Sequence, residues 1–167
     1  MAIKIAFTGP ESSGKTTLAN LITETFGGVL IEEYAREYLH QKTSYEQIDL
    51  DVIARKQIEN WKVEDDLIIA DTELTVIKVW SEYRYNSCSE LILDAYNNQT
   101  FDFYFLCKPD IPWEADPLRE NPDNRDELFE LYLNELTTMK RAFAVVEGDQ
   151  KNRLKICKKE ITRLVNG

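Results

Sequence analysis

Residues 9–17 read Gly-Pro-Glu-Ser-Ser-Gly-Lys-Thr-Thr, directly after the run Ile3-Lys4-Ile5-Ala6-Phe7-Thr8. The nonapeptide fits the pattern G-x-x-x-x-G-K-[ST] completely. A short β-rich run precedes it and a helical pattern follows it, which is the context this pattern requires. We therefore expect a strand, a phosphate-binding loop (residues 9–17) and a helix whose N-terminus faces a bound phosphate.

Each part of this loop has a chemical reason. Glycines let the backbone curl so that successive N–H groups point toward one phosphate. Lys15 is expected to reach the β- and γ-phosphates, and the Thr16 hydroxyl to bind Mg²⁺. ATP and Mg²⁺ are thus the predicted cofactors. The loop residues predicted to bind them are Gly9, Glu11, Ser12, Ser13, Gly14, Lys15, Thr16 and Thr17.

Composition narrows the class of protein around this motif. The chain has 167 residues with 20 Lys+Arg against 30 Asp+Glu, a formal net charge of -10. This length suits one domain, residues 1–167, and the acidic balance argues against nucleic acid as the main partner. No apolar run approaches a membrane span or a signal peptide. Three widely spaced cysteines give no disulfide framework, so we expect a cytoplasmic protein with no membrane partner.

Short apolar runs alternate with helical patterns along the chain. Strands are predicted at residues 3–8, 29–32, 67–70, 101–107 and 142–146. Apolar residues recur at helical spacing within 50–61, 129–136 and 154–164. Such alternation predicts an α/β fold, a three-layer P-loop NTPase with a five-stranded, mostly parallel sheet.

One segment interrupts the alternation. Residues 109–126 hold four of the five prolines and a dense set of charges. A long insertion without regular structure in a compact domain is usually functional or mobile. We expect this segment to be a lid over the carboxyl ends of the strands, where open α/β sheets bind ligands.

A second acid should help hold the metal. Asp71 ends the buried run 67–70, so it would emerge beside the phosphate-binding loop, at the position of a Walker B acid. Thr16 and Asp71 are the predicted Mg²⁺ ligands. The alternative is that Asp71 caps the helix that follows it.

Four segments together resemble one family. Residues 7–17 are joined by Glu32-Glu33-Tyr34-Ala35-Arg36-Glu37-Tyr38, by Asp71-Thr72-Glu73-Leu74 with Trp80, and by Asp110-Ile111-Pro112-Trp113-Glu114-Ala115-Asp116-Pro117-Leu118-Arg119. This set is similar to the ribosylnicotinamide kinase domain of NadR-type proteins, roughly from residue 3 to 165. The resemblance implies transfer of phosphate from ATP-Mg²⁺ to the 5′-hydroxyl of nicotinamide riboside. The fused members' adenylyltransferase and DNA-binding activities are not expected here.

The resemblance also implies an acceptor site. An acid after the second strand would hold ribose hydroxyls and accept the 5′-hydroxyl proton, with Glu33 the first choice and Asp71 its rival. The alternative is that Glu33 belongs to a solvated helix start. Arg36 lies nearby, and Tyr34, Trp80 and Trp113 are candidate stacking partners for a pyridinium ring. Core packing explains Trp80 almost as well.

Three arginines complete the predicted site. Arg119 and Arg125 would close on the phosphates and stabilise the charge that develops during transfer. Their alternative is surface pairing with Glu120, Asp123 and Asp126. Arg153, near the place where related kinases seat adenine, is a weaker candidate for nucleotide binding.

The reaction follows from these parts. A small domain with a charged lid fits phosphoryl transfer to a small molecule, in which positioning and charge neutralisation do most of the catalysis. Two other functions stay open. One is a kinase for another nucleoside or for a nucleoside monophosphate, for which Arg36 would be the only strong extra cation. The other is a regulatory P-loop ATPase that binds a protein partner.

Overall fold

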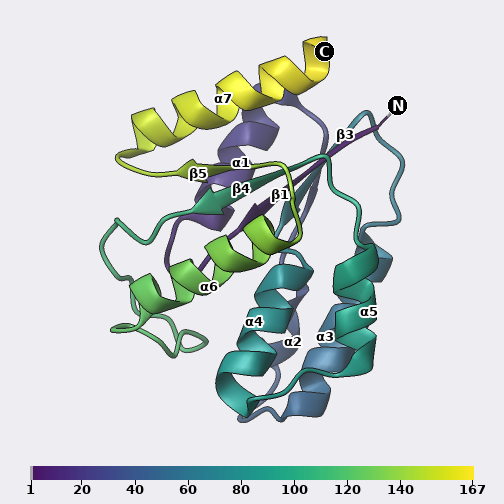
Figure 1. The fold of residues 1–167 in the computed structure, drawn as a ribbon, viewed down its shortest axis with the longest axis vertical. Helices are drawn as coiled ribbons and strands as arrows, with labels where there is room; N and C mark the ends of the chain where they lie inside the picture. Colours follow the sequence, from purple (N-terminus) through teal and green to yellow (C-terminus); the bar gives the residue numbers. More distant parts are fainter. Residues whose placement is uncertain (1) are drawn as a thin grey trace.

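Five parallel strands form the centre of the molecule in the computed structural model, which describes residues 2–167 (Figure 1). They are β1 (Ile3–Thr8), β2 (Val29–Ile31), β3 (Leu67–Asp71), β4 (Phe103–Cys107) and β5 (Phe143–Val146). Their order is β2-β3-β1-β4-β5, and every pairing is parallel. The phosphate-binding loop therefore leaves the central strand, between two neighbours whose carboxyl ends face the same way.

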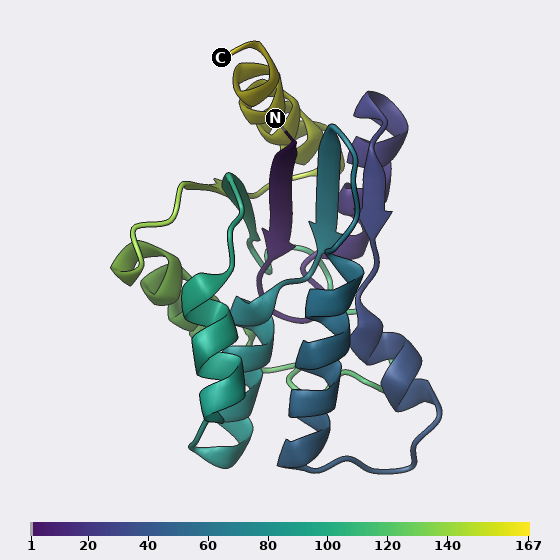
Figure 2. The same cartoon turned by 90° about the vertical axis from the view of Figure 1, so that its right-hand side faces the viewer.

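Helices cover both faces of this sheet (Figures 1 and 2). They are α1 (Lys15–Phe26), α2 (Tyr34–His40), α3 (Gln47–Asn60), α4 (Leu74–Tyr85), α5 (Glu90–Asn98), α6 (Arg125–Thr138) and α7 (Gln150–Asn166). Helices α1 and α7 pack on one face, and α4 and α6 pack on the other. The three-layer α/β prediction is confirmed. Within residues 2–167, no helix combines the length and the hydropathy that crossing a bilayer requires.

Alternation along the strands fills two cores. In β1, Ile5 and Phe7 point toward α1 and α7, whereas Ala6 points toward α4 and α6. A third cluster has no strand in it: Leu50 and Ile53 of α3 pack with apolar residues of α2, α4 and α5. Helices α2 to α5 thus form their own apolar cluster beyond the carboxyl ends of the strands (Figure 2).

The element boundaries differ slightly from those predicted. β3 continues through Asp71, and β4 begins only at Phe103, because Asp102 already uses its backbone and its carboxylate to bind Lys4 of β1. Helix α5 was not predicted. The sequence signal for its start is Ser89, a residue type favoured at helix N-caps. In the structure, the Ser89 side chain accepts a hydrogen bond from the Ile92 N–H.

The lid has no helix or strand and lies against the phosphate-binding loop. It ends at Asn124, two residues earlier than predicted, because α6 begins at Arg125. The Glu114 N–H donates to Ser12 Oγ at 3.0 Å, and the N–H groups of Glu120 and Asn121 donate to Glu11 Oε2, also at 3.0 Å each. The lid therefore covers the loop in this structure.

The two ends of the chain lie together. β1 begins and α7 ends at the same end of the molecule, and the phosphate-binding loop lies at the other end of β1 (Figures 1 and 2).

Candidate active site

The phosphate-binding loop contains three residues with positive φ, at one of which, Gly9, a side chain would not fit. Gly9 has φ 132°, and a Cβ there would lie 2.6 Å from the Cys107 carbonyl oxygen of β4. Ser12 has φ 53° and Gly14 has φ 87°. These left-handed residues turn the backbone back on itself between β1 and α1.

Two side chains of the loop, Lys15 and Ser13, bind the loop's own backbone. Lys15 Nζ donates to the carbonyl oxygens of Gly9 and Pro10, at 2.8 Å each, and Ser13 Oγ donates to the same Pro10 carbonyl at 2.7 Å. The ammonium group of Lys15 thus lies across the mouth of the loop. A phosphate entering the loop would replace these carbonyl partners.

Thr16 and Asp71 meet at the end of β3. The register of β1 and β3 places Phe7 beside Asp71, and Thr16 Oγ1 donates to Asp71 Oδ2 at 2.6 Å. Asp71 Oδ1 is buried and has no hydrogen-bond partner among the described residues. Burial raises the pKa of Asp71, and the Thr16 hydrogen bond and Lys15 oppose this. A buried, unpartnered carboxylate oxygen beside a hydroxyl is a donor set that fits Mg²⁺.

The helix cap considered for Asp71 belongs to Glu73. The Glu73 carboxylate accepts from the Thr75 N–H at 2.8 Å and from Gln99 Nε2 at 2.6 Å, fully buried. Between the two acids, Thr72 has φ 83°, which a β-branched residue rarely adopts. Glu73 and Gln99 therefore hold a strained turn that directs Asp71 toward the loop. Neither residue had a role predicted from the sequence.

A cavity of about 600 Å³ extends from the loop toward α2, α4 and α6, beneath the lid. Glu33, the N-cap residue of α2, lines it together with Lys15 and Thr16. Glu33 makes no side-chain cap hydrogen bond. Burial raises its pKa, Lys15 lowers it, and the charge of Asp71 raises it further. Glu33 is thus a half-buried acid on the cavity wall whose carboxylate does not cap the helix.

Of the three aromatic candidates, only Trp80 lines the cavity. Its indole N–H donates to the Tyr45 hydroxyl at 3.0 Å, and the two rings make an edge contact at 5.2 Å. Tyr34 packs beside Tyr38, with ring centroids 6.0 Å apart. Trp113 lies under the Arg125 guanidinium, 5.5 Å from it. Neither Tyr34 nor Trp113 is among the lining residues.

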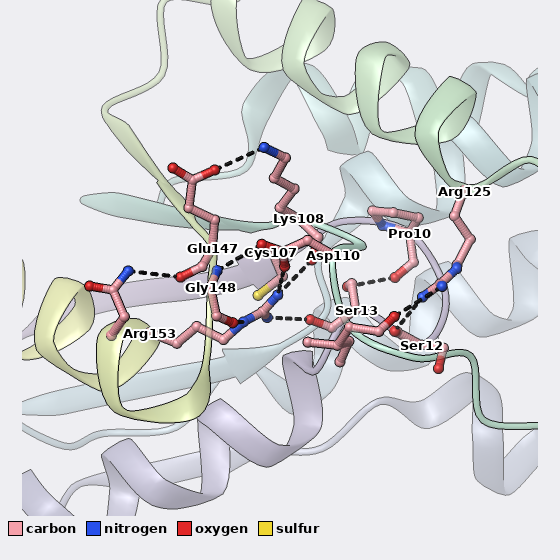
Figure 3. A network of polar contacts seen from close by, with 12 residues as sticks. Pro10, Ser12, Ser13, Cys107, Lys108, Asp110, Arg125, Glu147, Gly148 and Arg153 are labelled. Carbon is pink, nitrogen blue, oxygen red and sulfur yellow. Dashed lines mark hydrogen bonds and ion pairs between the residues drawn. The ribbon is translucent and has the colours of Figure 1, made fainter.

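Both Arg119 and Arg125 contact the phosphate-binding loop, and Figure 3 shows Arg125. Arg125 donates to the carbonyl oxygens of Ser12 and Ile111, at 2.9 and 3.0 Å. Arg119 lines the cavity, and its Nη1 donates to the Glu114 carbonyl and lies 3.5 Å from Ser12 Oγ. Among the ion pairs of the described residues, neither arginine pairs with the acids considered as alternative partners.

Arg153 lies behind the loop, off the cavity wall. Its guanidinium donates to the Ser13, Gly148 and Lys108 carbonyls, at 2.7, 2.8 and 2.7 Å, and to the Asp110 carboxylate (Figure 3). The side chain is almost wholly buried, and a Cβ on Gly14 would lie 3.3 Å from it. Arg153, predicted as a nucleotide contact, here supports the loop from beneath through protein contacts.

Two ion pairs of the cavity were not predicted. Arg36 binds Asp116 at 2.7 Å, and Arg84 binds both carboxylate oxygens of Glu120, at 2.6 and 2.7 Å. Arg84 lies four residues after Trp80 and eight after Val76, so helical spacing already placed it on their face. The helical register of Trp80 therefore predicts that Arg84 faces the cavity too.

Comparison with known proteins gives a consistent result. A family model described as "AAA domain" matches residues 4–153. The trifunctional NAD biosynthesis/regulator protein NadR of Escherichia coli is 28% identical over 127 residues, which cover 69% of this chain and 30% of that protein. The chain therefore spans about a third of the length of this relative.

Solved structures share the fold. A NadR protein in complex with NR superposes with a TM-score of 0.72 at 18% identity, over 89% of this chain and 46% of that one. Deoxyadenosine kinase from M. mycoides, with products dCMP and dCDP, superposes with a TM-score of 0.71 at 18% identity, over 96% of this chain and 100% of that one. These neighbours establish the fold of a P-loop kinase.

Proposed function

Since the chain belongs to the AAA domain family, whose model covers residues 4–153, we propose that it is an ATP-dependent nucleoside kinase. Its preferred acceptor is the ribose 5′-hydroxyl of nicotinamide riboside, and its product is nicotinamide mononucleotide. The likeness to NadR proteins supports this choice of acceptor.

The observation that carries the proposal is the shape of the cavity. Lys15 and Thr16 line one part of it and Glu33 lines another, in a common space of about 600 Å³. This volume is typical of a small-molecule site. A phosphate donor at the loop and a hydroxyl acceptor at Glu33 would therefore meet in one cavity.

The donor is held by the phosphate-binding loop. Its backbone N–H groups and the N-terminus of α1 attract the phosphates, and Lys15 exchanges its carbonyl partners for phosphate oxygens. Thr16 and Asp71 would hold Mg²⁺, which would neutralise phosphate charge when bound. Arg119, which lines the cavity, would stabilise the charge on the transferred group.

The acceptor hydroxyl is oriented by an acid. Asp71 already accepts a hydrogen bond from Thr16 and would serve the metal, so Glu33 is the acid left to accept a hydrogen bond from the 5′-hydroxyl. The proton can leave late, because the transition state of phosphoryl transfer is loose. A Glu33 carboxylate near neutral pH is basic enough for this role.

Turnover on matched acceptors tests the proposal. The protein is incubated with Mg²⁺-ATP and either nicotinamide riboside, a panel of other nucleosides or no acceptor, and ADP and phosphorylated product are both measured. Saturable formation of nicotinamide mononucleotide, lost in Lys15→Ala, is the expected result. Turnover on another nucleoside alone would reject the acceptor and keep the kinase. ADP release without any phosphorylated acceptor would favour a regulatory ATPase.

A further inference from the structure

The cations of the cavity fall into two groups. Lys15 and Arg119 lie at the phosphate-binding loop. Arg36 of α2 and Arg84 of α4 line the part of the cavity formed by these two helices, which we call the acceptor side. Both acceptor-side arginines are paired with carboxylates of the lid. Arg36 Nη1 binds Asp116 Oδ2 at 2.7 Å, and Arg84 Nη1 binds Glu120 Oε1 and Oε2 at 2.6 and 2.7 Å.

These lid carboxylates are held in place by further bonds. Asp116 Oδ1 accepts from the Leu118 N–H at 2.9 Å, and this bond together with Arg36 lowers the pKa of Asp116. Glu120 Oε2 also accepts from the Tyr45 hydroxyl at 2.8 Å. Since two residues hold each carboxylate, the lid sets ordered negative charge against Arg36 and Arg84.

Such an arrangement bears on the acceptor's charge. A phosphate monoester carries a charge of about −1.5 to −2 at neutral pH and binds best to arginines whose donors are free. Here, each acceptor-side arginine already donates to a carboxylate, and Glu33 adds an acid to the same cavity. A monophosphate would have to displace these carboxylates, while an uncharged or cationic nucleoside would not.

We propose that Asp116 and Glu120 are specificity-determining residues, which make the acceptor pocket select nucleosides over nucleoside 5′-monophosphates by occupying Arg36 and Arg84. This inference rests on the proposed function and narrows its substrate class. It also bears on turnover, because the product of such a kinase is itself a monophosphate. The same two carboxylates would weaken its binding once phosphate has been transferred.

Ligand pairs that differ only in the 5′-phosphate test this inference. Dissociation constants are measured by calorimetry for nicotinamide riboside against nicotinamide mononucleotide, and for thymidine against its 5′-monophosphate, with Mg²⁺ and a non-hydrolysable ATP analogue present. The unaltered protein should bind the better nucleoside more tightly than its monophosphate. In Asp116→Asn/Glu120→Gln, both arginines are released, so the affinity for the monophosphate relative to the nucleoside should rise. The rise should be about five- to tenfold and no more, because exposed ion pairs are individually weak.

Two further variants separate the mechanism from a general charge effect. Glu114→Gln removes one charge from the same lid and the same cavity. Among the described residues, no arginine binds the Glu114 carboxylate, since Arg119 donates to its backbone carbonyl. The ratio of monophosphate to nucleoside affinity should therefore change less than about threefold. Adding Arg36→Gln and Arg84→Gln to the double variant should cancel its gain. If the lid acids instead acted only by repelling the phosphate, the gain in monophosphate affinity would persist after both arginines are replaced.

The outcomes distinguish this inference from the proposed function. Equal binding of nucleoside and monophosphate by the unaltered protein, or no shift in the double variant, overturns the inference even if nicotinamide riboside is phosphorylated. Selective nucleoside binding that shifts as stated supports the inference even if turnover on nicotinamide riboside fails. Binding of neither member of any pair overturns it as well.

Discussion

At the scale of single residues, the two acids of the site are close enough for their charges to interact, Asp71 being buried and Glu33 half-buried. Burial raises the pKa of both Asp71 and Glu33, and the Asp71 charge raises that of Glu33 further. A carboxylate kept ionised in such a place destabilises the fold. Strain of this kind is common where a protein needs a reactive group.

Glu33→Gln should therefore gain stability and lose activity. The folded protein binds the Glu33 proton more tightly than the unfolded chain, so the wild type loses stability as pH rises above the ordinary pKa of 4.5. We expect a higher Tm for the variant at pH 7 to 8 and no difference below about pH 4. Turnover should fall by about 10² or more.

Melting curves across pH and initial rates check this prediction, with Glu37→Gln on the exposed side of α2 as the matched control. A wild-type activity that declines on acidification with an apparent pKa above 4.5 is also expected. Equal melting temperatures of Glu33→Gln and wild type at pH 8 would contradict the burial argument.

At the scale of elements, α7 is attached to the phosphate-binding loop by one buried side chain. Arg153 joins the loop, the end of β4 and the start of α7 through four acceptors. Arg153→Ala leaves several buried carbonyl groups and the Asp110 carboxylate without this donor. We expect a loss of about 3 kcal/mol of unfolding free energy. Urea denaturation measures it.

The control lies on the same helix. Arg163 is exposed, pairs with Glu160 at i,i+3 and lies 5.8 Å from the centre of the Phe103 ring, so Arg163→Ala should cost less than about 1 kcal/mol. If both alanine variants lost the same stability, Arg153 would not connect these elements as described.

The lid should depend on Glu11. Its carboxylate accepts the N–H groups of Glu120 and Asn121, so Glu11→Ala should speed hydrogen exchange at these two amides by about fivefold or more. Exchange in peptides covering residues 118–123 gives the measurement. Glu24→Ala, exposed on α1, serves as control, and unchanged protection in Glu11→Ala would show that other contacts hold the lid.

At the scale of the whole molecule, the site joins the phosphate-binding loop, α1, α2, α4, α6 and the lid, with Asp71 of β3 bound to Thr16, so a bound nucleotide should stabilise all layers together. A non-hydrolysable ATP analogue with Mg²⁺, at about 100 times its Kd, should add about 2.7 kcal/mol. This corresponds to a rise in Tm of roughly 5–10 °C.

Metal removal separates the contributions to that shift. Chelation of Mg²⁺ should reduce the rise in Tm for the wild type. In Asp71→Asn, the rise should no longer depend on Mg²⁺, because one of the two proposed ligands has lost its charge. Thermal-shift curves with and without the metal check this, and a full Mg²⁺ dependence in the variant would exclude Asp71 as a ligand.

Local patterns predicted much of this molecule. The five strands, the phosphate-binding loop and the approach of Asp71 follow from short-range features: apolar runs, glycine spacing and the common direction of parallel strands. The residues that bind the lid do not follow from such features, because their pairing depends on how an irregular segment folds back over the site. The pairing of Glu120 with Arg84, across 36 residues, has no counterpart in periodicity. Arg153 shows the same limit, since its buried position became clear only from the packing of α7.

The shared position of the chain ends has a practical consequence. β1 begins and α7 ends on the side away from the phosphate-binding loop (Figures 1 and 2). An affinity tag or a tether to a sensor surface, attached through either end, would leave the cavity mouth facing the solution. The same orientation permits a partner domain to be joined at either terminus without obstructing nucleotide entry, so immobilised protein should exchange ligands as freely as protein in solution.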